Sequence, residues 1–182
     1  MTDKEILEIF KSEGGQNQAF NLIVREYSQR LYWHLRELVF SHDDADDLLQ
    51  NTCMKAWSAL PKFRAESGLY TWLYRIATNE AFTFLKKERF NNKLSLTSYE
   101  TKLANRISTD PYFRGDTIQM LLQHEVAKLP DRQRAIFSMR YFQEMEYAKI
   151  AEILDSNPDA VKASYSLAYK KIEKNLKEFG KF

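Results

Sequence analysis

The chain has few of the residues that cross-link, break or turn a polypeptide, and this scarcity excludes several classes of protein. Among 182 residues there is one cysteine, Cys53, so no internal disulfide framework can form. Five glycines and four prolines leave few breaks in helices. No apolar run approaches the length of a membrane span, and the N-terminal MTDKEILEIF lacks the features of a secretory leader. We therefore expect an all-α cytoplasmic protein that does not insert into membranes.

Hydrophobic and charged residues are both plentiful. Hydrophobic residues make up 44% of the chain and aromatic residues 14%, which is typical of a protein with a packed core. The net charge of +2 results from 27 basic and 25 acidic residues, which are grouped along the chain. The net charge therefore says little about binding partners, and the local charge clusters matter more.

Apolar residues recur every three or four positions in three long stretches of the first half, the pattern of amphipathic helices. The stretches are residues 20–40, 41–60 and 69–89. Ser41 is a suitable N-cap for the second of them, and Thr2 with Glu5 predicts a capping box for a short helix before the first. The sequence thus predicts a first helical domain over residues 1–89.

The helical periodicity stops between residues 90 and 115, where Asn, Ser and Thr are frequent, so we predict a flexible linker there. Helices resume in residues 116–182. Near the end, YAKIAEIL, the turn DSN and a long helix that begins at Pro158 behind a capping Asn157 predict a helix-turn-helix. The expected fold is all-α, with two small helical domains joined by a flexible linker and the helix-turn-helix in the second.

No catalytic constellation is present in the sequence: the three histidines are far apart, and there is neither a phosphate-binding glycine loop nor a serine elbow. One acidic cluster has three interpretations. Asp43, Asp44, Asp46 and Asp47 could hold a magnesium ion, could interact with the dipole of the helix they begin, or could form a recognition surface for a basic partner. The residues alone leave these alternatives open.

Two segments have the composition of nucleic-acid-binding surfaces. Residues 62–93 carry seven basic and three acidic residues interleaved with aromatic ones, which favours single-stranded DNA. The polar side of this predicted helix carries Trp72, Arg75, Asn79, Lys86 and Arg89. The last helix carries six lysines against three acids from residue 159 onward, and as the second helix of a helix-turn-helix it is expected to enter the major groove. The alternative is that the lysines of this last helix only form a solvent-exposed face and do not contact DNA.

Four segments in order resemble regions two and four of the extracytoplasmic-function sigma factors of the sigma-70 family. They are DADDLLQNTCMKAWSALPKF, YTWLYRIATNEAFTFLKKERF, LPDRQRAIFSMRYFQEMEYAKIAEIL and NPDAVKASYSLAYKKIEKNL. The match covers most of the chain, and DADDLLQ, TWLYRIATN and LPDRQR at these separations are highly specific in combination. The resemblance implies a non-catalytic factor, without cofactor or metal, that directs core RNA polymerase in promoter recognition, DNA melting and transcription initiation.

The resemblance also implies three binding surfaces. The acidic helix would dock on core RNA polymerase through Asp43, Asp46, Asp47, Leu48, Gln50 and Asn51. The loop 63–68 and the next helix would open the minus-ten element and hold a flipped base of the melted non-template strand, through Phe63, Arg64, Ser67, Thr71, Trp72, Arg75, Asn79, Lys86 and Arg89. The helix-turn-helix would read the double-stranded minus-thirty-five element through Asp159, Lys162, Ala163, Ser166, Leu167 and Lys170.

The sequence departs from the family at four positions. Many relatives have an arginine-rich recognition helix, whereas this sequence has Ser164, Leu167 and Tyr169 there. Relatives usually carry an acidic residue at the position of Lys149. The promoter sequence therefore does not follow from the family, nor does the identity of any anti-sigma factor that acts as a partner. Two other functions stay open: a helix-turn-helix regulator that acts without polymerase, and a metal-dependent nuclease that uses the aspartate cluster.

Overall fold

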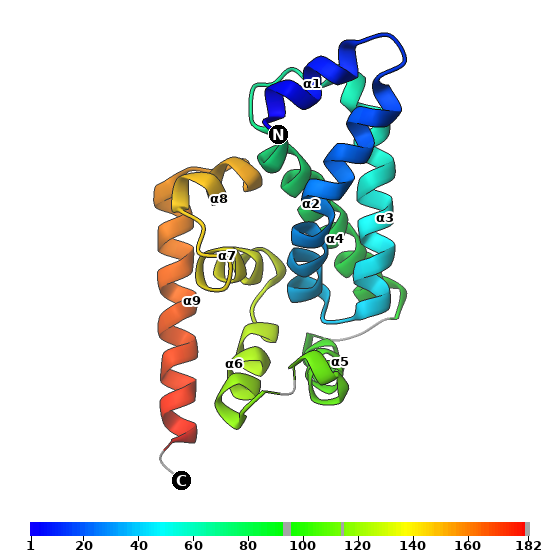
Figure 1. Ribbon diagram of the computed structural model, residues 1–182. Helices are drawn as coiled ribbons and strands as arrows, with labels where there is room; N and C mark the ends of the chain where they lie inside the picture. The colour runs from blue at the N-terminus through cyan, green and yellow to red at the C-terminus, as the bar shows by residue number, and fades with distance from the viewer. Residues whose placement is uncertain (93–95, 114, 181–182) are drawn as a thin grey trace.

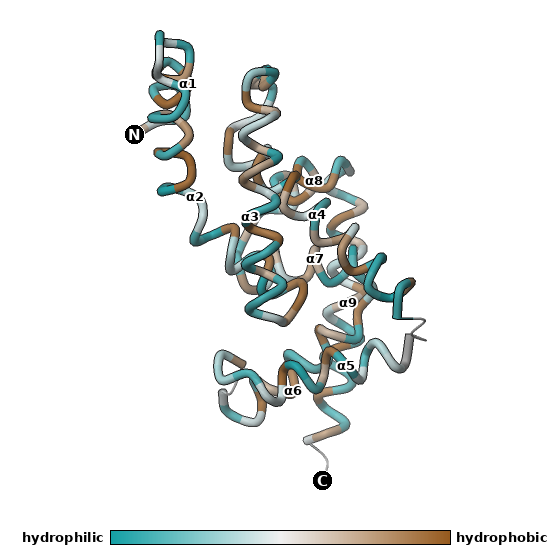
Figure 2. Tube along the Cα trace, turned by 90° about the vertical axis from the view of Figure 1, so that its right-hand side faces the viewer, coloured by the Kyte–Doolittle hydropathy of each residue, from teal (hydrophilic) through white to brown (hydrophobic). Residues whose placement is uncertain are grey.

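The computed structural model describes residues 1–92, 96–113 and 115–180, and all regular secondary structure in them is helical (Figure 1). The helices are α1 (Asp3–Lys11), α2 (Gln16–Val39), α3 (His42–Ala59), α4 (Leu69–Asn91), α5 (Leu96–Thr109), α6 (Thr117–Ala127), α7 (Asp131–Tyr141), α8 (Tyr147–Leu154) and α9 (Pro158–Phe179), with short 3-10 turns η1 (Leu60–Lys62) and η2 (Pro111–Phe113). Apolar and polar residues alternate around these helices (Figure 2), and none within the described residues is long and apolar enough to cross a membrane.

The predicted helix starts are confirmed. Thr2 and Glu5 form both bonds of a capping box at α1. The hydroxyl of Ser41 accepts the amide of the third residue of its helix, and the side-chain oxygen of Asn157 does the same for α9. These bonds satisfy amides that have no partner within the helix, so each start is determined locally.

The first domain is a bundle of α2, α3 and α4 with α1 packed against α2 (Figure 1). Leu35 and Leu38 of α2 are fully buried at its centre. In the second domain α9 packs against α6, α7 and α8, and Asp155, in the left-handed conformation with φ of 51°, makes the turn between α8 and α9. The predicted helix-turn-helix is therefore present.

The flexible linker predicted over residues 90–115 is corrected in part, because α5 covers Leu96–Thr109. Residues 93–95 and 114 of the segment lie outside the described residues. Tyr99, Leu103 and Ile107 of α5 are 3% exposed or less. They lie four residues apart and form a single narrow apolar stripe among polar neighbours, which is a weak periodicity in the sequence. The helix is stabilised by tertiary packing rather than by local propensity.

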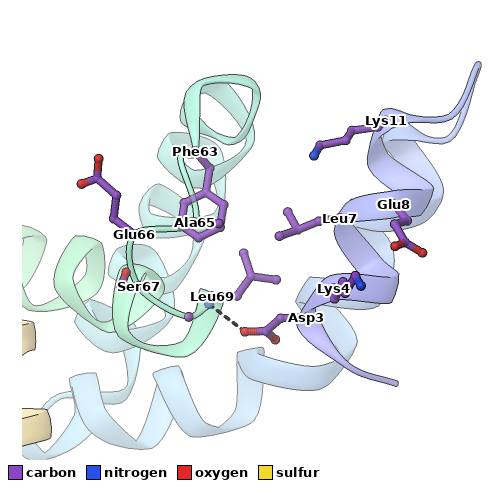
Figure 3. A pocket seen from close by; sticks show the side chains of 11 residues that line it. Asp3, Lys4, Leu7, Glu8, Lys11, Phe63, Ala65, Glu66, Ser67 and Leu69 are labelled. Carbon is purple, nitrogen blue, oxygen red and sulfur yellow. Dashed lines mark hydrogen bonds between the residues drawn. The ribbon is translucent and has the colours of Figure 1, made fainter.

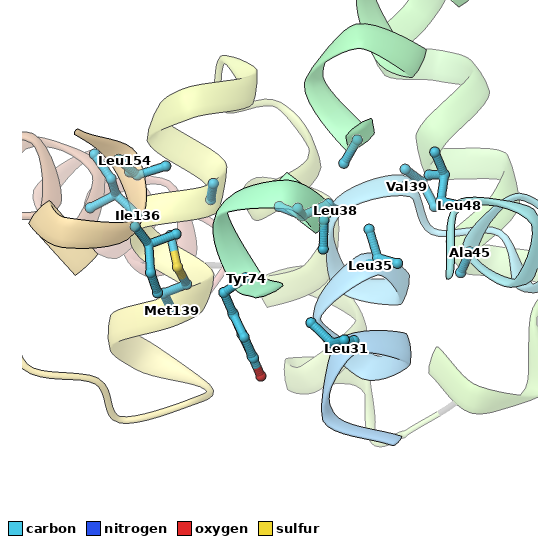
Figure 4. Close-up of a cluster of buried hydrophobic side chains, with 14 of the residues drawn as sticks. Leu31, Leu35, Leu38, Val39, Ala45, Leu48, Tyr74, Ile136, Met139 and Leu154 are labelled. Atoms are coloured by element: carbon cyan, nitrogen blue, oxygen red, sulfur yellow. The ribbon is translucent and has the colours of Figure 1, made fainter. Parts of the chain in front are cut away.

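One continuous hydrophobic cluster runs through both domains (Figure 4). Tyr74 of α4 lies between Leu38 of the first domain and Ile136 and Met139 of the second. Helix α4 packs against α7 and α8, and α2 also packs against α7. The two domains therefore form one packed unit in this structure, with α4 at its centre.

We predict that Leu103→Ala lowers the free energy of unfolding by about 2 to 5 kcal/mol, because it opens a cavity beneath α5. Urea unfolding followed by circular dichroism measures the change. Asn105→Ala on the exposed side of the same helix is the control, with a change within about 0.5 kcal/mol. Equal stability of both variants and the wild type would show that α5 is not packed.

Candidate nucleic-acid interface

The start of α3 carries an exposed acidic surface. Asp43, Asp46 and Asp47 are exposed, as are Gln50 and Asn51, while Asp44 forms an ion pair with Arg106 of α5 at 3.5 Å. In the described part of the chain, no group of three or more His, Cys, Asp or Glu side chains is placed to hold a metal ion. Within the described residues, the carboxylates of this turn are therefore separate charges rather than a clustered set of ligands.

Leu48 is the exception among the six residues predicted for this surface. Its side chain is 4% exposed and packs in the hydrophobic cluster between α2 and α3 (Figure 4). Leu48 therefore fixes the position of the acidic turn and does not itself present a contact surface.

The loop before α4 brings aromatic and basic side chains together. Phe63 packs against Trp72 with ring centroids 4.9 Å apart, and both are half-buried. Arg64 is exposed next to Ala65, whose φ of 56° places a non-glycine residue in the left-handed region. Ser67 is half-buried beside the first turn of α4 (Figure 3). The loop has a defined, locally strained conformation that is held by its surroundings.

The predicted reading face of α4 divides into two parts. Asn79 and Lys86 are exposed. Thr71, in contrast, is fully buried beneath α8, where its hydroxyl accepts a hydrogen bond from Lys149 Nζ at 3.1 Å. Arg75 donates to the backbone carbonyl of Glu152 at 2.6 Å. The N-terminal end of this face is covered by the first helix of the helix-turn-helix.

Further along α4, Arg89 donates two hydrogen bonds to the carboxylate of Asp131, at 2.9 and 2.6 Å, at the start of α7. A bidentate arginine–carboxylate pair is among the stronger polar interactions in proteins. Three of the nine predicted minus-ten residues are thus engaged by the second domain: Thr71, Arg75 and Arg89.

A buried polar cluster joins the domains beside these contacts. Gln143 of the second domain donates from its amide nitrogen to His34 Nδ1 at 3.0 Å and to Glu37 Oε2 at 3.2 Å, and Ser138 donates to the same carboxylate oxygen. The other ring nitrogen of His34 lies 2.8 Å from the Thr78 hydroxyl. A neutral ring with its proton on Nε2 satisfies both contacts of His34.

The outer face of α9 is open along its length. Of the six predicted residues, Ser166 is half-buried. The other five are exposed: Asp159, Lys162, Ala163, Leu167 and Lys170. Val161, Ala168 and Ile172 are buried on the opposite side of the helix. The structure therefore brings the six residues together on one surface, as expected of a recognition helix.

Two residues at these surfaces have roles that no local sequence pattern predicts. Lys149, noted only as a departure from the family, donates to Thr71 and lies 5.6 Å from the ring centroid of Tyr70. Asp3 accepts the Leu69 amide at 2.8 Å and so caps α4. Asp3 lies 66 residues from Leu69 in the sequence, so no local pattern could have identified the pair.

Comparisons with known proteins identify the family of the chain. Residues 23–91 match the family model described as Sigma-70 region 2, and residues 119–172 match Sigma-70, region 4. The chain is 28% identical to the ECF RNA polymerase sigma-E factor of Haemophilus influenzae, with 97% of this chain and 96% of the relative covered. It is 25% identical to the ECF RNA polymerase sigma factor SigW of Bacillus subtilis, with 98% of each chain covered.

Two solved structures share the fold. The sigma factor RpoE of Bartonella quintana, in complex with the anti-sigma factor NepR, matches with a TM-score of 0.69 at 23% identity over 87% of this chain and 96% of that one. CnrH in complex with the cytosolic domain of CnrY matches with the same TM-score at 20% identity over 97% of each chain. The chain belongs to the sigma-70 family of transcription initiation factors. Within that family it is an extracytoplasmic-function RNA polymerase sigma factor.

The buried cluster predicts a pH dependence of stability. Burial lowers the pKa of His34 from 6.5 to about 3, and burial raises the pKa of Glu37. Because the folded-state pKa of His34 is depressed, its contribution to stability is present above pH 6.5 and is lost as pH falls toward 3. Glu37 has the opposite sign: its contribution is present at low pH and is lost as pH rises through its raised pKa.

We therefore predict that from pH 7 to pH 5 the wild type loses up to about 2 kcal/mol more stability than a His34→Gln variant. Glu37 is common to both proteins, so its effect cancels in the comparison. Urea unfolding at each pH measures the difference, and parallel stability profiles would contradict a neutral, buried His34.

Proposed function

We propose that this sigma factor contacts its partners through three surfaces: the acidic turn of α3 for core RNA polymerase, the loop 63–68 with α4 for the melted minus-ten element, and α9 for the minus-thirty-five duplex. It acts in the cytoplasm and catalyses no reaction itself. The observation that carries the proposal is that one chain presents an exposed acidic surface and two separate DNA-compatible surfaces on two domains. A regulator that binds DNA through the helix-turn-helix alone leaves the first domain without a role.

The polymerase surface is supported by the exposure of its charges. Asp43, Asp46 and Asp47 have no ion pair within the described residues, while the neighbouring Asp44 is paired internally. Charges of one sign that stay exposed at a helix start cost little and remain available to a basic partner. Gln50 and Asn51 extend the same exposed surface by one helical turn.

Contact of Thr71, Arg75 and Arg89 with the melted strand requires the domains to separate. Thr71 and Arg75 lie against α8, and Arg89 is held by Asp131, so none of the three can meet DNA in the closed arrangement. Interfaces between domains of one chain commonly permit relative motion. We therefore take the closed arrangement as that of the free protein and an opened one as that of the polymerase-bound protein.

An anti-sigma factor is a further proposed partner. RpoE is bound to the anti-sigma factor NepR in its solved structure, and CnrH is bound to the cytosolic domain of CnrY. Both proteins share the fold of this chain. A protein that binds across the two domains would hold Thr71, Arg75 and Arg89 away from DNA. Its identity does not follow from the residues of this chain.

Reconstitution tests the proposed function. The purified chain is added to core RNA polymerase and genomic DNA, and transcript starts are mapped. We expect starts that share two upstream sequence elements and that are absent without the chain. Random starts with and without it would contradict the proposal. Binding of the chain to palindromic DNA as a dimer would indicate a polymerase-independent regulator. Magnesium-dependent cleavage of the DNA would indicate a nuclease.

We predict that Asp46→Lys combined with Asp47→Lys abolishes binding to core polymerase, because it reverses two exposed charges at the docking surface. Stability should change by less than about 0.5 kcal/mol. Co-purification with core polymerase measures the effect. Glu13→Lys with Glu26→Lys makes the same charge change at exposed positions of the same domain and should bind normally. Undiminished co-purification of the Asp46 and Asp47 variant would refute this surface.

We predict that Lys162→Ala weakens binding of holoenzyme to the upstream duplex and reduces the slope of log affinity against log salt by about 0.9, the value for one lost phosphate contact. Arg25→Ala removes one positive charge from an exposed position of α2, outside the proposed DNA surfaces, and should leave the slope unchanged. If both variants keep the wild-type slope, α9 does not contact phosphate at Lys162.

A further inference from the structure

A cavity lies where α2, α4 and η2 meet the residues that follow α7, and we call it the interdomain cavity. Its volume is about 480 Å³, within the usual range of pockets for small organic molecules, roughly 300 to 1,000 Å³. The second domain contributes Phe142 and Gln143 to its lining. None of the residues proposed for the three binding surfaces lines it. Since cavities between domains are frequent ligand sites, the interdomain cavity is a candidate for a further one.

One face of α2 forms the floor of the interdomain cavity. Arg30, Trp33 and Glu37 all line it, and they follow one another at intervals of three and four residues. This spacing places the three side chains on one face of the helix. Seven residues separate Arg30 from Glu37, so the two positions lie roughly 10 Å apart along the helix axis. Helix α2 thus places a cation and a carboxylate at opposite ends of the floor, with an indole ring between them.

Glu37 is a largely buried carboxylate that lacks a cationic partner in the part of the chain that the structure describes. Its Oε2 accepts from the Ser138 hydroxyl at 2.5 Å and from the Gln143 amide at 3.2 Å, and both donors are neutral. His34 beside it is neutral too, because burial lowers its pKa to about 3. Burial raises the pKa of Glu37, as expected of a carboxylate without a positive charge nearby. A cationic group in the cavity would supply the missing partner.

Arg30 lies at the other end of the floor and is exposed. Its guanidinium forms no ion pair with another described residue, and a free guanidinium is well suited to a carboxylate or phosphate. Two other cations lie near the cavity without lining it, Lys149 and Arg36. Lys149 donates to Thr71, and Arg36 is paired with Asp110 at 2.6 Å. Arg30 is therefore the lining cation that remains available to an anionic group.

Aromatic rings line the cavity between the two charges. Trp33 stacks on Tyr112 of η2 with ring centroids 4.5 Å apart, and Tyr70 stacks on Tyr74 of α4 at 4.4 Å. Phe142 adds a ring from the second domain. Aromatic faces stack on other flat rings and also attract cations. The middle of the cavity therefore suits a flat aromatic body.

We propose that the interdomain cavity binds a small aromatic zwitterion, with an ammonium or amidinium group at Glu37 and an anionic group at Arg30. The two lining charges have opposite signs and lie at opposite ends, so such a ligand pairs with both. Because it also contacts Phe142 and Gln143, the ligand binds the closed arrangement and opposes separation of the domains. This last consequence rests on the proposed function, in which the domains separate when polymerase and promoter DNA bind.

Calorimetric titration of the full chain with three probes tests the site. Benzamidine carries the positive group alone, benzoate the negative group alone, and para-carboxybenzamidine both. We expect para-carboxybenzamidine to bind with a Kd of about 0.1 to 1 mM, the range for a ligand of this size. Benzamidine should bind about fivefold more weakly because it leaves Arg30 without a partner, and benzoate should bind most weakly because it cannot pair with Glu37.

Glu37→Gln keeps an oxygen that can accept from Ser138 and Gln143 but removes the charge. It should weaken binding of both amidines about tenfold and leave benzoate unchanged. Arg30→Ala should abolish the advantage of para-carboxybenzamidine over benzamidine. Glu26→Gln, at an exposed position of the same helix, is the matched control and should bind all three probes as the wild type does. Circular dichroism establishes that each variant is folded.

The site is refuted if the three probes bind the wild type equally, or if Glu37→Gln keeps the wild-type affinities. Transcript mapping without any probe tests the proposed function separately. Promoter-directed starts together with no preference for the zwitterion leave the proposed function standing and overturn the site. Zwitterion binding by a chain that directs no starts does the reverse.

The effect on domain separation has its own measurement. Saturating para-carboxybenzamidine should weaken binding of the wild-type chain to core polymerase and promoter DNA severalfold, because the closed arrangement is stabilised. The Glu37→Gln variant should be insensitive to the same concentration, which controls for any action of the probe on the polymerase. Equal affinity of the wild type with and without the probe would contradict binding to the closed arrangement.

Discussion

The arrangement of the whole molecule depends on the packing of α4 from both sides. One side completes the core of the first domain, and the other meets α7 and α8, where Arg75 donates to the Glu152 carbonyl at 2.6 Å and Thr71 is fully buried. The same side carries three of the residues proposed to read melted DNA, namely Thr71, Arg75 and Arg89. Under the proposed function, packing of the second domain and binding of the strand compete for these residues, and we propose that the closed structure opens before the chain binds melted DNA.

The contacts between the domains are suited to such an exchange. Many are hydrogen bonds to groups that DNA or water can replace, and a typical bond of this kind contributes only about 1 kcal/mol net. The Arg89–Asp131 pair is stronger, but its guanidinium is equally suited to a phosphate. The apolar part of the interface, around Ile136 and Met139, resists separation, so a partner such as the polymerase must supply binding free energy.

The contacts that a residue makes with its neighbours in the sequence could be predicted. The contacts that depend on distant segments of the chain could not. The capping bonds of Thr2, Ser41 and Asn157 are made within three residues, and all were predicted. Helix α5 was missed because its apolar stripe is narrow and gains its stability from distant helices. Thr71 was expected to contact the minus-ten element because of the family resemblance, but α8 buries it, and the contact of Asp3 with Leu69 spans 66 residues. The roles of individual site residues stay predictions.

The most direct test of this account is the distance between the domains, measured by fluorescence resonance energy transfer. Cysteines for dye attachment replace Met54 of α3 and Lys174 of α9, which are both exposed. Cys53 is first replaced by Ser so that only the two introduced thiols react with the dyes. We expect high transfer in the free chain and a marked loss of transfer when core polymerase and promoter DNA are added. Unchanged transfer in a complex that initiates at mapped promoters would show that α4 reads DNA with the second domain still in place, and would contradict the account.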